Sequence, residues 1–256
     1  MKFLLIVAIA ICGFAHTNGR TLFEDKVLGG TLASPGQFPH QVSQRVNQVH
    51  YCGGSILDKN TILTAAHCVD GKDYTTINIV VGSNQLNEGG MWYSVSQYIM
   101  HLEWNPYTFV NDIAVFKVTV PIEFTKYVQP ITLEHNFVPD DLECTLSGWG
   151  ITSYPGSTPP NDLLYFTGKV VNLNQCRESM PPTNLLVLNS HICAYASKGI
   201  GVCSGDSGGA LVANNKQIGI TSWVVYCATG VPDVYTKVSH YSAWIEEQQA
   251  QTNQCV

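Results

Sequence analysis

Short apolar runs separated by turn-forming residues dominate this chain and restrict the folds that it can adopt. Between about residues 41 and 222, runs rich in β-branched and aromatic residues alternate with Gly, Pro, Asn and Asp. Examples are residues 77–81 (INIVV), 114–118 (AVFKV), 168–171 (GKVV) and 217–223 (QIGITSW). Many short strands with frequent turn signals are typical of all-β barrels and sandwiches. Helical periodicity is scarce, and the best candidate helix is C-terminal, over Tyr241 to Gln251.

An apolar run at the N-terminus predicts secretion. After Met1 and Lys2, residues 3–14 carry no charge. This run is too short for a membrane span and is typical of a signal peptide. Small residues favour cleavage after Ala15 or after Gly19, so we expect residues 1–19 to be a signal peptide. No later apolar stretch approaches about 20 residues, which predicts a soluble extracellular protein.

The cysteines fit an oxidising compartment. Of nine cysteines, Cys12 leaves with the signal peptide and eight remain: Cys52, Cys68, Cys144, Cys176, Cys193, Cys203, Cys227 and Cys255. An even number in a secreted chain favours disulfides over metal ligation. No Cys-x-x-Cys or His-rich zinc spacing occurs.

Charge and length exclude some classes of function. The formal net charge is −6 and only 12% of residues are charged. This leaves no basic footprint for nucleic acid and no polybasic patch for a membrane surface. The 256 residues suffice for one large or two small globular units.

Two distant motifs carry the chemistry. Residues 205–209 (GDSGG) place the Ser207 hydroxyl in a glycine-rich turn, and residues 64–68 (TAAHC) place His67 beside a cysteine. A serine becomes a good nucleophile when a positioned base takes its proton, and glycines let backbone N–H groups approach an oxyanion. The same turn satisfies the Gly-x-Ser-x-Gly pattern of esterases and lipases. That fold needs alternating helices and a histidine after the serine, but this chain is β-rich and only His240 follows.

The residues resemble the chymotrypsin-like (trypsin-fold) serine endopeptidases over nearly all of residues 27–249. The motifs occur in the family's order: 27–30 (VLGG), 52–55 (CGGS), 64–68 (TAAHC), 112–115 (DIAV), 147–150 (SGWG), 205–209 (GDSGG), 222–223 (SW) and 234–238 (VYTKV). The resemblance implies an all-β fold of two six-stranded antiparallel β-barrels with a C-terminal helix. It also implies an active site in the crevice between the barrels.

The resemblance assigns roles to individual residues. Ser207 is expected to be the nucleophile, His67 the general base, and Asp112 the group that holds and stabilises the imidazole. The backbone N–H groups of Gly205 and Ser207 are expected to form the oxyanion hole. All three triad residues are present, which disfavours a catalytically silent binding protein on the same fold.

The resemblance also implies activation by proteolysis. Cleavage after Lys26 would release a propeptide of residues 20–26 and leave a peptidase domain of residues 27–256. The freed α-amino group of Val27 is expected to pair with Asp206, and this pairing selects the arrangement that forms the oxyanion hole. Leu28 stands where valine is commoner in the family. No further domain precedes Val27, which favours a digestive or similarly simple extracellular protease.

Three disulfides follow from the resemblance: Cys52–Cys68, Cys176–Cys193 and Cys203–Cys227. Cys144 normally pairs with a cysteine on the strand after the nucleophile, but that position holds Ala213. Cys144 and Cys255 therefore either pair with each other, stay free, or bond to other chains. Parity alone favours their pairing.

The expected substrate pocket combines features with conflicting effects. Gly201 lies at its base, where trypsins carry an aspartate that selects Lys and Arg. Ser222 is also expected to line the pocket, and Val224 narrows its neck and disfavours the largest side chains. Asp233 places a carboxylate on a pocket wall instead of the floor. The combination is similar to broad-specificity collagenolytic proteases.

Two interpretations of the pocket remain. In the first, the protein cleaves after Leu, Phe, Tyr or similar P1 residues, with some tolerance for basic ones. In the second, the Asp233 carboxylate is bonded to pocket backbone groups and is inert toward substrate.

The expected partners follow from this function. They are protein or peptide substrates, an activating protease that cuts after Lys, and protein protease inhibitors. We expect a monomer that binds neither nucleic acid nor membrane and needs no cofactor. Some relatives bind calcium after the histidine, but Ser83 and Asn84 stand where an acidic ligand is expected, although Glu88 follows, so we predict no metal site.

Overall fold

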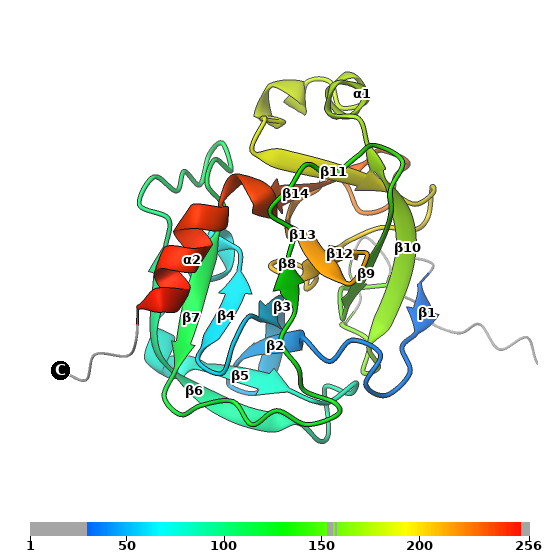
Figure 1. Ribbon diagram of the computed structural model, residues 1–256. Helices are drawn as coiled ribbons and strands as arrows, with labels where there is room; N and C mark the ends of the chain where they lie inside the picture. The colour runs from blue at the N-terminus through cyan, green and yellow to red at the C-terminus, as the bar shows by residue number, and fades with distance from the viewer. Residues whose placement is uncertain (1–29, 153–155, 157, 252–256) are drawn as a thin grey trace, which may run out of the picture.

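Six strands of the N-terminal half close into a barrel (Figure 1). The computed structural model describes residues 30–152, 156 and 158–251. The strands are β2 (Gln41–Val46), β3 (Val49–Ile56), β4 (Thr61–Thr64), β5 (Ile77–Val81), β6 (Met91–Met100) and β7 (Ala114–Val118). Their order around the barrel is β2-β3-β4-β7-β6-β5, and antiparallel pairing of β5 with β2 closes it.

The register of this barrel explains why two distant motifs meet. Strand β4 pairs antiparallel with β7, and Thr64 lies opposite Ala114. His67 follows the end of β4, and Asp112 precedes the start of β7. Both residues therefore leave the barrel at the same rim. Residues of β4 and β7 are fully buried, so apolar burial on this sheet holds the rim in place.

The C-terminal half forms a second closed ring of six strands. They are β9 (Glu143–Gly148), β10 (Leu164–Val171), β11 (His191–Tyr195), β12 (Ala210–Ala213), β13 (Lys216–Trp223) and β14 (Asp233–Lys237). The order is β10-β11-β14-β13-β12-β9, and pairing of β9 with β10 completes the ring. Two short strands attach to it: β1 (Thr31–Leu32) along β10, and β8 (Thr132–Leu133) along β13. The prediction of two six-stranded antiparallel barrels is confirmed.

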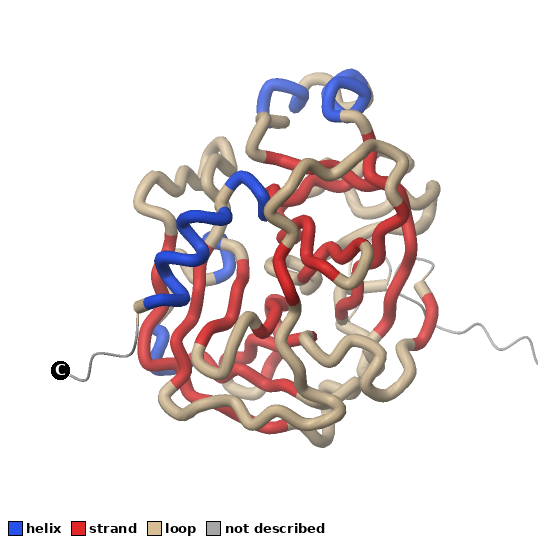
Figure 2. The backbone as a smooth tube through the Cα atoms, viewed as in Figure 1, coloured by secondary structure: helices blue, strands red, loops and turns tan. Residues whose placement is uncertain are grey.

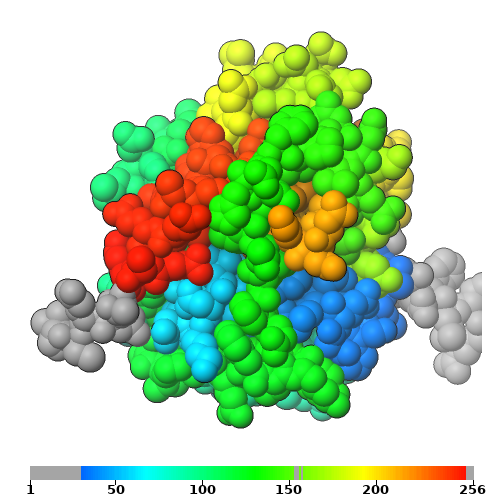
Figure 3. Space-filling view, in the orientation of Figure 1, coloured from blue at the N-terminus to red at the C-terminus, as the bar shows by residue number. Residues whose placement is uncertain are grey.

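Helices are few and short (Figure 2). The described α-helices are α1 (Leu173–Glu178) and α2 (Ser242–Ala250), and short 3-10 helices span Ala66–Cys68, Tyr74–Thr76, Thr183–Leu186 and Val238–His240. Ile245 of α2 is buried in the core of the N-terminal barrel, and Trp244 packs against this core. The expected C-terminal helix is therefore present, and in Figure 3 it lies beside the green segment that joins the barrels. No helix within the described ranges is long and apolar enough to cross a membrane.

Three disulfides join described residues, one in the N-terminal half and two in the C-terminal half. They are Cys52–Cys68, Cys176–Cys193 and Cys203–Cys227, the pairs that the resemblance implied. Cys144 has no disulfide partner among the described residues and is buried in the core of the C-terminal barrel. The pairing of Cys144 with Cys255 stays a prediction. Cys255 itself lies outside the described residues, as do the expected signal peptide and propeptide.

Candidate active site

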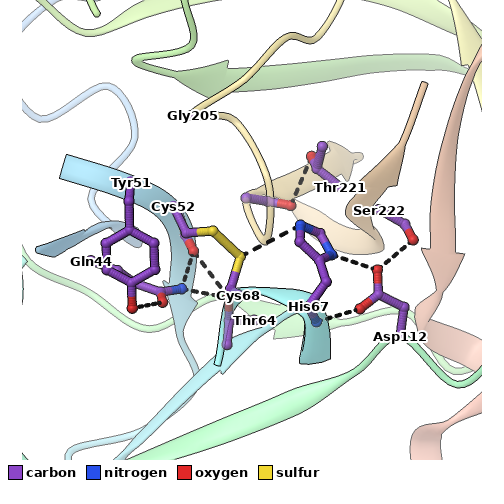
Figure 4. Close-up of a disulfide and its surroundings, with 12 residues drawn as sticks. Gln44, Tyr51, Cys52, Thr64, His67, Cys68, Asp112, Gly205, Thr221 and Ser222 are labelled. Atoms are coloured by element: carbon purple, nitrogen blue, oxygen red, sulfur yellow. Dashed lines mark hydrogen bonds and ion pairs between the residues drawn. A yellow bond between two sulfur atoms is a disulfide. The ribbon is translucent and has the colours of Figure 1, made fainter. Parts of the chain in front are cut away.

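His67 and Asp112 form a bonded pair at the rim of the N-terminal barrel (Figure 4). The backbone N–H of His67 donates to Asp112 Oδ1 at 2.9 Å, and the ring Nδ1 lies 2.8 Å from Asp112 Oδ2. An ionised carboxylate only accepts hydrogen bonds, so Nδ1 carries the proton and Nε2 presents a lone pair. The His67 side chain is 23% exposed, while that of Asp112 is fully buried. The arrangement leaves a basic nitrogen facing the open side.

Two hydroxyl groups of the C-terminal barrel donate hydrogen bonds to Asp112. The Ser222 hydroxyl donates to Asp112 Oδ2 at 2.5 Å, and the Thr236 hydroxyl donates to the Asp112 carbonyl oxygen at 2.8 Å. Ser222, predicted as a pocket residue, thus also orients the acid. Because strands β13 and β14 supply these bonds, the His67–Asp112 pair lies at the junction of the two barrels.

Close backbone approaches hold the turn of Ser207 against the same rim. The Gly53 N–H donates to the Ser207 carbonyl oxygen at 2.7 Å. Gly208 has a φ of +77°, and a Cβ placed there would overlap Thr64 Oγ1. Only glycine fits such a position, because the conformation disfavours a side chain and the space is filled. The fold therefore brings Ser207 and His67 to one crevice.

The groups needed for nucleophilic attack are free in this arrangement. Within the described part of the chain, no hydrogen bond joins Ser207 Oγ to His67 Nε2. The polar atom recorded near His67 Nε2 is Cys68 Sγ, at 3.8 Å. Catalytic hydrogen bonds are often long without substrate. The backbone N–H groups of Gly205 and Ser207 donate to no acceptor among the described residues. Two unpaired donors beside a hydroxyl can receive an oxyanion.

His50 orients the Gly205 peptide, and sequence reasoning missed it. Its Nε2 lies 3.0 Å from the Gly205 carbonyl oxygen, so Nε2–H donates there. Its Nδ1 lies 2.9 Å from Ser43 Oγ, which in turn accepts from Arg45 Nε at 2.9 Å. Burial lowers the pKa of His50 to about 4, and this keeps the ring neutral. A histidine within a strand matches no motif, so no sequence signal marked this role.

Asp206 is a buried carboxylate without a described cation. Its Oδ1 accepts from the Gly150 N–H at 2.8 Å and its Oδ2 from the Cys203 N–H at 3.0 Å. A Cβ placed on Gly148 would overlap Oδ1, so glycine makes room for the acid. Burial raises the pKa of Asp206 to about 6, against the lowering effect of the two backbone bonds. Lys26 and Val27, the other expected activation residues, lie outside the described residues.

The Asp233 carboxylate lies against Gly201, the residue expected at the base of the substrate pocket. A Cβ placed on Gly201 would lie 3.0 Å from Asp233 Oδ2, which also accepts from the Val202 N–H at 3.1 Å. The assignment of Asp233 to a wall of that pocket stays a prediction. Val224, expected at the neck, packs against the core cluster of the C-terminal barrel.

One aromatic ring, that of Phe109, lies edge-on to His67 and packs near two tryptophans. Phe109, at a φ of +55°, lies 6.3 Å from the His67 ring and 6.3 Å from the Trp223 ring. Trp104 lies 6.0 Å from Phe109. No sequence motif marked Phe109, whose place depends on the loop between β6 and β7.

The candidate metal group among the described residues is part of a disulfide. Among the described residues, Cys52, His67 and Cys68 are the group whose ligand atoms lie close enough together to hold an ion. Both cysteines are consumed by the Cys52–Cys68 disulfide, so no thiolate remains to bind a metal.

A serine on a glycine turn, a bonded histidine–aspartate pair and two closed barrels define a class of hydrolases that act by acyl transfer. Comparison with known proteins agrees. The family model described as Trypsin matches residues 27–245. This chain belongs to the trypsin family and is a serine endopeptidase.

Its relatives include proteins named as trypsins and as a chymotrypsin. Trypsin delta of Drosophila melanogaster is 33% identical over 249 residues, covering 96% of this chain and 98% of that protein. Chymotrypsin-2 of Vespa crabro is 38% identical over 224 residues, covering 87% of this chain and all of that protein (100%). The solved structure of mouse neuropsin, a serine protease, superposes with a TM-score of 0.80 at 29% identity, covering 86% of this chain and 99% of that one. The relatives include both trypsins and a chymotrypsin, so their names leave the P1 preference open.

Proposed function

We propose that this protein is a secreted serine endopeptidase, made as a zymogen and activated by cleavage after Lys26. The single observation that carries the mechanism is the His67–Asp112 pair, bonded at 2.8 Å, at the rim against which the Ser207 turn packs. In this arrangement one hydroxyl, one base and two free N–H donors face the same crevice.

The residues act in a fixed sequence. Ser207 Oγ attacks the scissile carbonyl carbon while His67 Nε2 takes the hydroxyl proton. The oxyanion accepts hydrogen bonds from the N–H groups of Gly205 and Ser207, and Asp112 stabilises the imidazolium. His67 then gives its proton to the leaving amine, and the C–N bond breaks to leave an acyl-enzyme. Water repeats the sequence, with His67 as base, and releases the acid and the free serine.

The surroundings of Asp206 support the proposed activation. The carboxylate is 1% exposed and has backbone donors but no described cation. A buried carboxylate is stabilised strongly by a paired cation. The α-ammonium of Val27, freed by cleavage after Lys26, would supply that cation next to Ser207.

The pocket residues support cleavage after apolar and aromatic P1 residues, with tolerance for basic ones. Gly201 leaves the base without a carboxylate of its own, and Val224 adds apolar surface at the neck. The Asp233 carboxylate over Gly201 favours basic side chains. The single hydrogen bond from Val202 supports the inert interpretation, in which Asp233 serves only the pocket backbone.

The proposed setting is extracellular. Three disulfides fit an oxidising compartment, and the partners we propose are protein substrates, a lysine-directed activating protease and protein inhibitors. We propose a monomer with a digestive or similarly simple role, since two of its relatives carry the names trypsin and chymotrypsin.

The test is activation followed by substrate profiling. The purified proenzyme is treated with a lysine-directed protease, its new N-terminus is sequenced, and a mixed peptide library is digested. We expect a chain starting at Val27 that cleaves after Leu, Phe and Tyr, and a Ser207→Ala variant that cleaves nothing. A different start would defeat the activation proposal, and cleavage only after Arg would defeat the pocket assignment.

A further inference from the structure

Arg45 is a buried cation that the proposed mechanism does not use. It is 4% exposed on strand β2, and it forms no ion pair among the described residues. Its Cζ lies 5.0 Å from the centre of the Trp92 ring, and its Nη1 donates to the Leu86 carbonyl oxygen at 2.7 Å. A buried charge is costly unless it is paired or hydrogen-bonded, so the remaining contact of this guanidinium, with Ser43, calls for an explanation.

A shift in strand register brings His50 to the sheet face that carries Ser43 and Arg45. These two residues are two positions apart on β2, so their side chains leave the same face. The pairing moves one step along β2, from Gln44 to Arg45, but two steps along β3, from Cys52 to His50. Without this extra residue, His50 would lie one position further along β2 and its ring would leave the other face. The shift therefore aligns three polar side chains.

The hydrogen bonds among these groups run in one direction. A guanidinium only donates, so Arg45 Nε donates to Ser43 Oγ at 2.9 Å. His50 Nε2 lies 3.0 Å from the Gly205 carbonyl oxygen, which only accepts, so Nε2 carries a proton. On a neutral ring Nδ1 then has a lone pair, and it accepts the Ser43 hydroxyl proton across 2.9 Å. Each donor in this chain therefore points toward Gly205.

The charge of Arg45 supports this direction in two ways. A hydrogen bond from a charged donor is stronger than one from a neutral donor, and it polarises the Ser43 hydroxyl so that the hydroxyl donates more strongly to His50. The positive charge also opposes protonation of the ring, because burial is the main cause of the lowered pKa of His50 and Arg45 adds to it. A protonated His50 would direct a second N–H at the Ser43 oxygen, which already accepts from Arg45.

We propose that Arg45 is a positioning residue for the oxyanion hole and acts through Ser43 and His50 on the Gly205 carbonyl group. The inference rests on the proposed endopeptidase function, because it concerns the N–H donor of Gly205. Gly205 has a φ of +105°, a conformation that residues with a side chain rarely adopt. The bond from His50 restricts rotation of its carbonyl group, and with it the direction of the N–H of the same residue. The chain of hydrogen bonds therefore holds this donor in place before substrate arrives.

The kinetic test compares Arg45→Met, Ser43→Ala and the double variant after activation by cleavage after Lys26. The chain of hydrogen bonds lies behind the Gly205 peptide, so we expect KM to change little. Loss of one hydrogen bond of ordinary strength should lower kcat about fivefold in each single variant. If Arg45 acts through Ser43, the double variant should lose no more than Ser43→Ala alone. Arg177→Met, in which the lost Nε also donates to a backbone carbonyl, is the matched control and should keep the wild-type values.

Nuclear magnetic resonance gives a second readout that does not depend on activity. In protein labelled with ¹⁵N-histidine, the Nε2–H signal of His50 is identified by its loss in His50→Phe. In the wild type we expect this proton to resonate downfield and to exchange slowly with water, as in a strong hydrogen bond. In Arg45→Met and Ser43→Ala it should move upfield and exchange faster, because the bond to the Gly205 carbonyl is weaker. Arg177→Met should leave the signal unchanged.

Each outcome decides a separate claim. Losses that multiply in the double variant would show that Arg45 acts by a route other than Ser43. A lower kcat with an unchanged Nε2–H signal in Arg45→Met would make its role structural and overturn the proposal. An unchanged signal in Ser43→Ala would overturn it even if Arg45→Met does not fold. An activated wild-type protein that hydrolyses no peptide would refute the endopeptidase function, while the Nε2–H signals would still decide whether Arg45 acts on His50.

Discussion

Replacing Asp233 by asparagine should stabilise the folded protein, and the gain should grow with pH. Burial raises the folded-state pKa of Asp233 from 3.8 to about 7. Below pH 3.8 the carboxyl is protonated in both the folded and the unfolded chain, so its ionisation costs nothing. Between pH 3.8 and about 7 the unfolded chain has lost this proton while the folded chain still holds it, so folding becomes less favourable as pH rises; above about 7 the folded chain buries the charge and the loss is complete. Stability that is present at low pH is therefore lost at high pH, and the Asp233→Asn variant has no such loss.

The size of this effect follows from the two pKa values. They differ by roughly three, and each pKa unit is worth about 1.4 kcal/mol, so the advantage of Asp233→Asn should reach about 4 kcal/mol above about pH 8. Urea denaturation followed by tryptophan fluorescence measures it, in a Ser207→Ala background to prevent self-cleavage. Asp141→Asn, on an exposed turn, is the control and should show no comparable gain. Parallel pH profiles for Asp233→Asn and its parent would refute the reasoning.

Three shorter predictions test other parts of the site. Gly208→Ala should lower the free energy of unfolding by about 2 kcal/mol more than Gly71→Ala does. Both glycines have positive φ, but of the two only Gly208 lacks room for a Cβ. Equal losses in urea denaturation would contradict this. His50→Phe removes the hydrogen-bond donor to the Gly205 carbonyl oxygen, and it should lower kcat by about tenfold or more with KM little changed. An unchanged kcat in steady-state kinetics would count against this role of His50. Cys144 should react with iodoacetamide only after denaturation, because burial raises the pKa of its thiol to about 12; labelling of the native protein at Cys144, mapped by mass spectrometry, would disprove this.

Much of the fold could be predicted from the sequence because it depends on local patterns. Short β-branched runs between turn residues indicated an all-β barrel or sandwich, and the family motifs predicted the two barrels and three disulfides that the structure forms. The meeting of His67 with Asp112 was predicted by resemblance alone. Its physical cause, the pairing of Thr64 with Ala114, appears only when strand register is known.

The remaining features depend on where side chains end in space. The sequence places Asp233 near the expected pocket, but the close approach of its carboxylate to Gly201 depends on where the side chain ends. His50 acts through a carbonyl contributed by a turn 155 residues away in sequence. Counting cysteines could not show that Cys144 lies in the core of the C-terminal barrel, without a disulfide partner among the described residues.

Asp206 and Asp233 should be coupled, and activation should therefore tune the substrate pocket. Both are buried acids without a described cation, and the charge of Asp206 contributes to the raised pKa of Asp233. If the α-ammonium of Val27 pairs with Asp206, the negative field at Asp233 weakens and its pKa falls. The pH at which Asp233→Asn gains half of its stability advantage should then be lower in the chain cleaved after Lys26 than in the uncleaved chain, both carrying Ser207→Ala. Identical midpoints in the two forms would show that Asp206 and Asp233 titrate independently, or that the new N-terminus does not reach Asp206.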